Sequence, residues 1–323
     1  MSSLKNYTKF QGVNNIGETS LMSEIETNLK AWMDWAFLEI GAWFDVSINA
    51  SGAYGGDFST LRMASDSNYT EGQVWETFRR DMVWESGLHL SSAQPIQVSG
   101  VWVDDTFYES DDATYGHYVD YPNGRIVFDS AISTSAKVQL EYSYRWVQTH
   151  HAETPWWQQL HYRSFRVDDD HFKRQASGQW DIGPHHRVQM PAVVIEPVAQ
   201  RTFTPYEMGN SSHWVRQNVV FNIVAETKWE RNQLADILSV QDDKVVWFFD
   251  TNAMRVAEDF PLDSRGEKVG KTPPMYPDLV SETGYRWQKC RFINTTINEV
   301  ESPNPGLFMA KVLTTLEMVS GNI

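Results

Sequence analysis

The sequence contains few of the residues on which several classes of protein depend. Its 323 residues include one cysteine, Cys290, which excludes an internal disulfide and a metal cage made of thiolates. No apolar run approaches the roughly 18 residues that span a bilayer, and the first residues have neither the apolar core nor the cleavage site of a signal peptide. We therefore expect a soluble protein that folds in a reducing compartment and does not enter a membrane.

Positive charge is also scarce. The chain has 27 Lys and Arg against 42 Asp and Glu, which gives a formal net charge of −15. No basic stripe interrupts this acidic character, and a strongly acidic protein repels the phosphates of nucleic acid. We therefore expect no sequence-specific contact with nucleic acid.

The motifs of the common enzyme classes are missing as well. The sequence has no phosphate loop, no GxGxxG fingerprint and no GxSxG turn for a serine nucleophile. Paired carboxylates for glycoside hydrolysis have no fixed spacing in a sequence, so a hydrolase with unidentified acids stays open as a third hypothesis. We predict that the protein is not an enzyme and has no catalytic residues and no cofactor.

The candidate metal ligands do not follow the spacing of a known metal site. Adjacent histidines seldom point at one ion, and the acidic run 168–170 does not have the alternation of a calcium loop. The residues around Cys290 alternate as in a strand, which predicts a buried thiol, although Lys289 and Arg291 can lower its pKa. We predict no metal site, so we expect ordinary loop histidines at His150, His151, His161, His171, His185 and His186.

Aromatic residues, by contrast, are abundant. They make up 13% of the chain and include 14 Trp. Such a surplus is typical of protein interfaces, where Trp and Tyr supply contact area at a low entropy cost. A core rich in tryptophan is the equally acceptable alternative.

Changes in hydrophobic period divide the first half of the chain. Residues 1–18 are polar and predict an extended arm that a neighbouring chain orders. Residues 19–94 predict a helical region, with one helix from Ser20 to Gly41 and a second over 70–86. Residues 95–150 alternate and predict an antiparallel β module, whose candidate strands are 96–103, 117–121, 125–129 and 137–147, with a turn at 122–124.

The second half predicts an α+β domain. After an irregular connecting segment at 151–191, residues 192–323 show the order β-β-α-β-β-β, which indicates one helix packed on a mostly antiparallel sheet. The helix, 229–239, should place Leu234, Ile237 and Leu238 on strand residues Val219, Phe221 and Ile223 and should turn Arg231, Asn232 and Asp236 outward, with Trp229 at the edge. The proline-containing loop 251–284 is predicted to contact a neighbouring subunit.

This domain resembles the small α+β module of tailed-bacteriophage tail-terminator and related neck proteins. The resemblance rests on a long strand, on a helix with Trp229, Arg231, Leu234 and Leu238, and on the following strand that ends in 248–250. It implies a virion structural subunit, assembled in the host cytoplasm, that forms a ring of six copies as a tail terminator or head–tail connector. Its partners would be neighbouring neck, portal-adaptor, and tail tube or sheath proteins.

A second hypothesis is a tail or baseplate component that binds a receptor or a glycan. It rests on exposed aromatic residues around the β module, namely Trp102, Phe107, Tyr108, Tyr115 and Tyr118. Because aromatic rings and polar tips are also common in cores and interfaces, the residues alone do not separate this hypothesis from the first. The two differ in whether a ring or a monomer is the functional unit.

Overall fold

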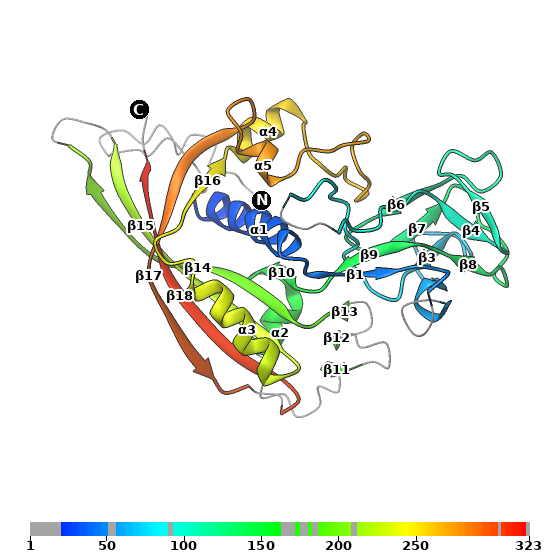
Figure 1. Ribbon diagram of the computed structural model, residues 1–323, viewed down its shortest axis with the longest axis horizontal. Coiled ribbons are helices and arrows are strands. Elements are labelled where there is room, and N and C mark those ends of the chain that lie inside the picture. Colours follow the sequence, from blue (N-terminus) through cyan, green and yellow to red (C-terminus); the bar gives the residue numbers. More distant parts are fainter. Residues whose placement is uncertain are drawn as a thin grey trace.

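The computed structural model has an α+β architecture built around one large sheet and one smaller β module. It describes residues 21–50, 56–89, 93–162, 172–174, 180–182, 187–207, 212–302 and 305–320. In Figure 1 the large sheet and its helices occupy the left of the molecule and the β module occupies the right. Among the described residues, no helix has the length and apolar character needed to cross a membrane.

The large sheet has six strands, and most of them come from the second half of the chain. β10 pairs with β14 in parallel, and every other neighbouring pair is antiparallel. In spatial order the strands are β10 (Gln148–His151), β14 (Ala192–Pro205), β15 (His213–Ala225), β18 (Phe308–Ser320), β17 (Arg286–Val300) and β16 (Val245–Phe249). The strands predicted in 192–323 are therefore confirmed, and β10 is an added edge strand.

Two helices cover one face of this sheet. On β15 the alternate residues Val219, Phe221 and Ile223 are buried in the core that also holds Leu234 and Leu238 of α3 (Lys228–Ser239). The helix α1 (Leu21–Glu39) contributes to the same core, so the sheet carries two packed helices where the sequence predicted one. The predicted inward face of α3 is confirmed, because Ile237 also packs against this core.

The abrupt change from strand to helix before α3 has a local cause. Thr227 adopts an extended backbone and its side chain accepts a hydrogen bond from the Glu230 amide, while the Glu230 carboxylate accepts one from the Thr227 amide. This capping box satisfies two amides that the first helical turn leaves free. The helix therefore begins within three residues of the end of β15.

The prediction that Arg231 faces outward is wrong. Its side chain is buried, with 7% of the residue exposed, and its Nη1 donates to Glu299 Oε1 on β17 at 2.5 Å. The first turn of α3 lies next to β17, so the long side chain lies along the sheet and pairs there. Asn232 and Asp236 are exposed as predicted, and Trp229 is 67% exposed.

Polar contacts fix α1 to the edge of the sheet. The buried Asn28 side chain donates from Nδ2 to the Phe249 carbonyl at 3.0 Å, and its Oδ1 accepts from the Phe249 amide at 2.7 Å. These two bonds satisfy the end of β16 as a neighbouring strand would. Gly41, with a φ of +83°, ends the helix as predicted.

The β module contains three small sheets, with orders β2-β3-β7-β6, β5-β4-β8 and β1-β9. The turn at 122–124 joins β6 and β7 as predicted, and Gly124 has a φ of +63°. The module also extends further back along the chain than predicted, because its strands begin at Trp43. They are β1 (Trp43–Val46), β2 (Arg62–Met63), β3 (Val74–Glu76), β4 (Val101–Val103), β5 (Thr106–Tyr108), β6 (His117–Asp120), β7 (Arg125–Phe128), β8 (Val138–Gln139) and β9 (Tyr142–Arg145).

The helix predicted over 70–86 is wrong. This segment contains β3, whose residues pair with β7, and the rest of it is irregular. Val74 and Trp75 are adjacent and both buried, so the two side chains, which point to opposite faces of the strand, are both covered. Asp81 then adopts a φ of +57°, which a continuous helix does not allow.

The connecting segment is more regular than predicted. Residues 155–162 form α2 (Pro155–Tyr162), and the short strands β11 (Phe172–Arg174), β12 (Trp180–Ile182) and β13 (Arg187–Val188) form a separate sheet. Trp156 and Trp157 are buried with Val194, Val224 and Met309, so α2 covers part of the second face of the large sheet. At least these two tryptophans belong to a core.

A cluster of buried and half-buried charges joins α1 to the β module. The Arg145 guanidinium on β9 donates from Nη2 to both oxygens of Glu85, at 2.5 and 2.6 Å, and its Nε lies 3.3 Å from Asp81. Its Nη1 reaches the Asp34 carbonyl on α1 at 3.2 Å, and Lys30 pairs with the Asp34 carboxylate at 2.5 Å. We call these five residues the ionic junction.

Two carboxylates of the ionic junction, Asp81 and Asp34, have pKa values shifted in opposite directions. Burial raises the pKa of Asp81 to about 6, although Arg145 acts in the opposite direction. Burial also acts to raise the pKa of Asp34, but Lys30 and Arg145 outweigh it and the pKa lies below its usual value. Asp81 is therefore the member of the junction that takes up a proton in mildly acidic solution.

The packing of α3 predicts the effect of truncating its side chains. Leu238→Ala should lower the free energy of unfolding by about 2–5 kcal/mol, because it leaves a cavity between the helix and the sheet. Trp229→Ala on the exposed side of the same helix should change it by no more than about 0.5 kcal/mol. Urea unfolding of both variants measures the difference. Equal losses would contradict the packing.

The ionic junction predicts a specific pH dependence. A carboxyl whose pKa is raised on folding contributes stability that is present at low pH and is lost as the pH rises through the folded pKa. The free energy of unfolding should therefore fall by about 1 kcal/mol between pH 5 and 7.5 through Asp81, because its partial exposure reduces the full effect.

Asp81→Asn should remove this part of the pH dependence, and Asn tolerates the positive φ at this position. Urea unfolding of the parent and the variant at both pH values measures it. Asp34 titrates below this window, so its contribution stays constant between the two measurements. An identical pH dependence in the two proteins would contradict the assignment to Asp81.

Candidate functional site

The loop between β16 and β17 contacts the β module of its own chain. It contains α4 (Thr251–Ala257) and α5 (Tyr276–Leu279), and between them residues 259–270 form a segment that we call the strap. The Tyr121 amide donates to the Gly266 carbonyl at 3.1 Å, and Lys268 Nζ donates to Gln97 Oε1 at 3.3 Å. The loop predicted to contact a neighbouring subunit therefore packs within the subunit.

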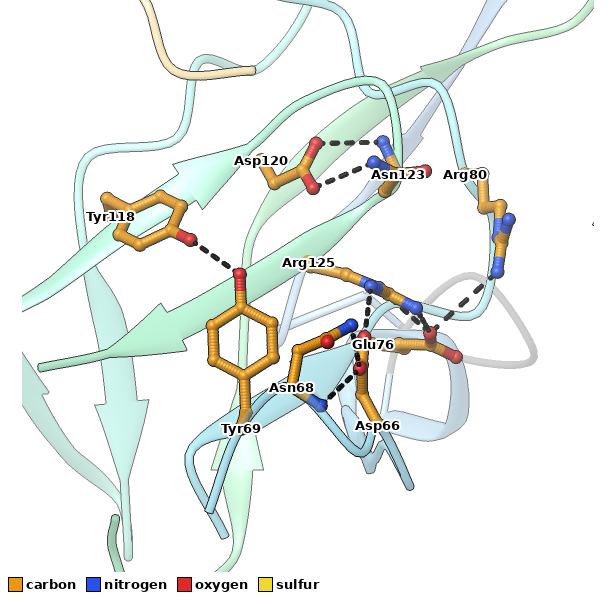
Figure 2. Close-up of polar contacts among 9 residues, drawn as sticks. All are labelled: Asp66, Asn68, Tyr69, Glu76, Arg80, Tyr118, Asp120, Asn123 and Arg125. Carbon is orange, nitrogen blue, oxygen red and sulfur yellow. Dashed lines mark hydrogen bonds and ion pairs between the residues drawn. The ribbon is translucent and has the colours of Figure 1, made fainter. Parts of the chain in front are cut away.

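A polar cleft of about 590 Å³ lies between the strap and the β6–β7 hairpin. Its walls come from three separate parts of the chain, which are the segment between β2 and β3, the hairpin and the strap. Most of the lining side chains are polar, and they include Asp66, Asn68, Tyr69, Tyr118, Asp120, Asn123, Arg125, Asp263, Ser264 and Arg265. Figure 2 shows the polar contacts on the β-module side of this cleft.

Two tyrosines meet at the cleft. The hydroxyls of Tyr69 and Tyr118 are 3.1 Å apart and share a hydrogen bond (Figure 2). Burial and then the hydrogen bond with Tyr69 raise the pKa of Tyr118, so its hydroxyl keeps its proton. The Arg265 guanidinium of the strap lies 4.8 Å from the centroid of the Tyr118 ring. The pair therefore offers two hydroxyls, and the guanidinium of Arg265 lies over the Tyr118 ring.

Asp120 closes the turn of the hairpin. Its Oδ1 accepts from the Asn123 amide at 3.1 Å and its Oδ2 accepts from Asn123 Nδ2 at 2.8 Å. Burial raises the pKa of Asp120, although both bonds from Asn123 act in the opposite direction. The two carboxylate oxygens can accept about four hydrogen bonds in total. Asn123 uses two of these positions, so each oxygen can still accept a hydrogen bond from a ligand.

Arg125 ties the floor of the cleft together. Its Nε and Nη2 donate to Glu76 Oε1 at 3.0 and 2.7 Å, and its Nη1 donates to Asp66 Oδ2 at 3.1 Å. The hydrogen bond from the Asn68 amide, followed by the nearby Arg125, lowers the pKa of Asp66. The floor is therefore a fixed network in which each charge has a partner of opposite sign.

Of the histidines and the cysteine named in the sequence, His150, His151 and Cys290 have described side chains, and these three do not come together in a site. Burial lowers the pKa of His150 to about 3, so it stays neutral against the edge of Trp156. Burial raises the pKa of the Cys290 thiol on β17, so the effect expected from Lys289 and Arg291 does not prevail. His161 lies in α2, and His171, His185, His186 and the run 168–170 lie outside the described residues.

Within the described part of the chain, no three His, Cys, Asp or Glu side chains come close enough together to hold a metal ion.

The aromatic residues named for glycan binding are divided among several places. The ring centroids of Trp102 and Phe107 are 4.7 Å apart, and those of Tyr108 and Tyr115 are 4.4 Å apart. Tyr118 lines the cleft. The five residues therefore do not form one surface.

Most of the cleft has no signal in the sequence. The run 120–123 has the Asp and Asn of an Asx-type turn, which is a signal for a hairpin but not for a binding site. Arg265 and Arg125 are separated by 140 positions in the sequence. Only the tertiary structure brings the strap to the hairpin. No spacing rule connects them.

Two further surfaces are apolar and are not covered by any of the residues that the structure describes. The first, which we call the groove, has a volume of about 350 Å³ and lies among α1, the end of α3, β16 and α5. Ile40 and Val245 at its rim are largely exposed, and Trp35, Trp247 and Tyr276 line it. β16 is an edge strand of the large sheet, so the groove lies along a sheet edge.

The second surface is the end of the paired strands β14 and β15, which we call the aromatic tip. Phe203, Tyr206 and Trp214 are exposed there, and the rings of Tyr206 and Trp214 are 5.5 Å apart. Figure 1 shows these strands projecting beyond the helices at the upper left of the molecule. An aromatic group on a projecting end is typical of a contact with another protein.

The strap approaches the hairpin so closely at Gly266 that a single added methyl group should disturb the contact. A Cβ at Gly266 would lie 2.5 Å from Asp120 Oδ1 and 2.9 Å from Pro122 Cδ, and both atoms are held by the turn. Gly266→Ala should therefore push the strap away from the β module. Hydrogen exchange of the peptide that covers 259–268 should become faster.

Gly270→Ala is the matched control. Gly270 also has a positive φ, +74° against +81° for Gly266, but a Cβ there meets no atom within 4 Å. Both variants should lose about 1–2 kcal/mol through backbone strain, and only Gly266→Ala should expose the strap to exchange. Equal exchange in the two variants would show that the strap does not depend on this approach.

Comparison with known proteins adds no identity to these sites. No protein-family model matches the chain, and no curated protein matches its sequence. The cleft, the groove and the aromatic tip are therefore interpreted from their own chemistry.

Proposed function

We propose that the chain is a structural, non-catalytic subunit of a tailed-phage virion, and that it assembles into a ring at the neck as a head–tail connector or tail terminator. One observation carries the proposal. The described residues leave two apolar surfaces of unlike shape uncovered, a concave groove at a sheet edge and a projecting aromatic tip. The resemblance of residues 192–323 to tail-terminator modules supports the same assignment.

The occupant that we propose for the groove is the aromatic tip of a second copy. A contact between two different surfaces of one chain is heterologous, and repetition of such a contact closes a ring when the rotation allows it. The charges agree with this pairing, because Lys244 lines the groove and the exposed Glu207 lies next to Tyr206 of the tip. A six-fold ring is the closure that the resemblance implies.

The net charge suits a subunit around a DNA passage. A formal charge of −15 per chain, repeated around a ring, repels phosphates and lets DNA pass without binding to the wall. The partners that we propose are neighbouring neck and tail proteins of the virion. Sequence-specific contact with nucleic acid is not part of the proposal.

Native mass spectrometry of the full chain tests the ring. The parent should form a closed oligomer, and the double variant Tyr206→Ser, Trp214→Ser and the groove variant Val245→Asp should each remain monomeric. Phe107→Ser and Ile297→Asp are the matched controls, because they change exposed apolar residues outside both surfaces and should still assemble.

Mixing the two defective variants gives the sharper result. The tip variant keeps an intact groove and the groove variant keeps an intact tip, so an equimolar mixture should give mixed dimers and no ring. A parent that stays monomeric at its highest soluble concentration would contradict the proposal. Rings formed by either defective variant would show that the subunit contact lies elsewhere.

A further inference from the structure

We infer that the polar cleft between the strap and the β6–β7 hairpin binds a neutral carbohydrate of one or two sugar units. This inference does not rest on the ring, because the cleft shares no lining residue with the groove or the aromatic tip. In Figure 1 the β module also lies at the opposite end of the molecule from the tip. A volume of about 590 Å³ falls within the usual range of small-ligand sites.

The charges of the cleft do not favour an anion. Arg125 already donates to Glu76 and Asp66, and Arg265 donates to Asp263 at 3.1 Å and to Glu267 at 3.3 Å. Each guanidinium is thus neutralised by carboxylates on both sides. A phosphate or carboxylate ligand would have to compete with these carboxylates for the same donors.

The carboxylates do not favour a metal ion either. Asp66 is held by Arg125 and by Asn68, and Asp120 is held by Asn123. A cation would lie beside Arg125 and Arg265, and both guanidinium groups would repel it. Ca²⁺ also takes six to eight oxygen ligands, which these few committed carboxylate oxygens do not supply.

A sugar fits because its hydroxyls both donate and accept hydrogen bonds. The cleft offers acceptors on Asp120 and Asp66, donors on Arg125 and Arg265, and the two tyrosine hydroxyls, which do both. Adjacent sugar hydroxyls can bind a carboxylate and a guanidinium at once without separating the ion pair. A polar ligand without net charge therefore matches groups that already have hydrogen-bond partners within the protein.

The cleft also has the apolar contacts that a sugar ring needs. Tyr69 is 36% exposed, and Pro122 and Leu262 line the same cavity. An aromatic ring with a polar tip buries the C–H face of a sugar while its hydroxyl stays hydrogen-bonded. The fixed contacts of Tyr69 with Tyr118, and of Arg265 with the Tyr118 ring, hold this platform in place before a ligand arrives.

Binding of the fluorescently labelled full chain to an array of mono- to tetrasaccharides tests the inference. The parent should retain at least one neutral sugar, and calorimetric titration of that sugar then gives its Kd. Tyr69→Ala should weaken this Kd by about tenfold or more, because the platform and one hydroxyl partner are lost. Arg265→Ala should weaken it in the same direction.

Phe107→Ala is the matched control, since Phe107 is 40% exposed on the same module and lies outside the cleft. It should leave the Kd unchanged, and the midpoint of thermal unfolding should be the same for it and for Tyr69→Ala. The monomeric tip variant, Tyr206→Ser with Trp214→Ser, should bind the sugar with the parent's affinity per site. Sugar binding by this variant therefore tests the inference about the cleft independently of the proposed ring.

Several outcomes would overturn the inference. They are an array on which the native chain retains no more sugar than the heat-denatured chain, a Kd that Tyr69→Ala leaves unchanged, and equal weakening by Tyr69→Ala and Phe107→Ala. Saturable binding of inorganic phosphate or Ca²⁺ that Tyr69→Ala or Arg265→Ala abolishes, without binding of any sugar, would assign the cleft to another class of ligand.

Discussion

The Arg145 guanidinium is the contact on which the rest of the molecule depends. It neutralises Glu85 and Asp81 within the β module and also donates to the backbone of α1, which packs on the large sheet. A buried charge with several partners is costly to leave unpaired, so the two halves of the chain fit together only where these groups meet. The position of the β module against α1 follows from this junction, while the apolar core and Asn28 hold α1 on the sheet.

The strap adds a second connection between the same two halves. The loop that contains it runs from the edge strand β16 to β17 of the large sheet, and the strap contacts the β6–β7 hairpin. The polar cleft exists because of this contact, since one wall belongs to the strap and the other to the module. The groove and the aromatic tip belong to the large sheet and its helices. The surfaces that we propose for assembly and for ligand binding therefore lie in different parts of one chain.

The large sheet was readable from the sequence because its strands are long and one face is buried. Alternation over 13 to 15 residues in β15, β17 and β18 exceeds anything that a helix or a loop produces. The segment 70–86 lacked such length. Its strand β3 has three residues, and its apolar side chains fit a helical period as well as a strand, so pairing with β7 decided the outcome.

Local chemistry in the sequence determined the elements that carry their own signals, namely the capping box at Thr227, the turn at 122–124, the end of α1 at Gly41 and the inward face of α3. Tertiary structure decided which elements meet. The helical period predicted Arg231 on an outer face. In the folded chain it is buried and donates a hydrogen bond to Glu299, which lies 68 positions away in the sequence. The cleft likewise joins Tyr69, Tyr118 and Arg265 from distant segments. Periodicity describes one element at a time, whereas ion pairs and clefts depend on distances between elements, which the folded chain alone sets.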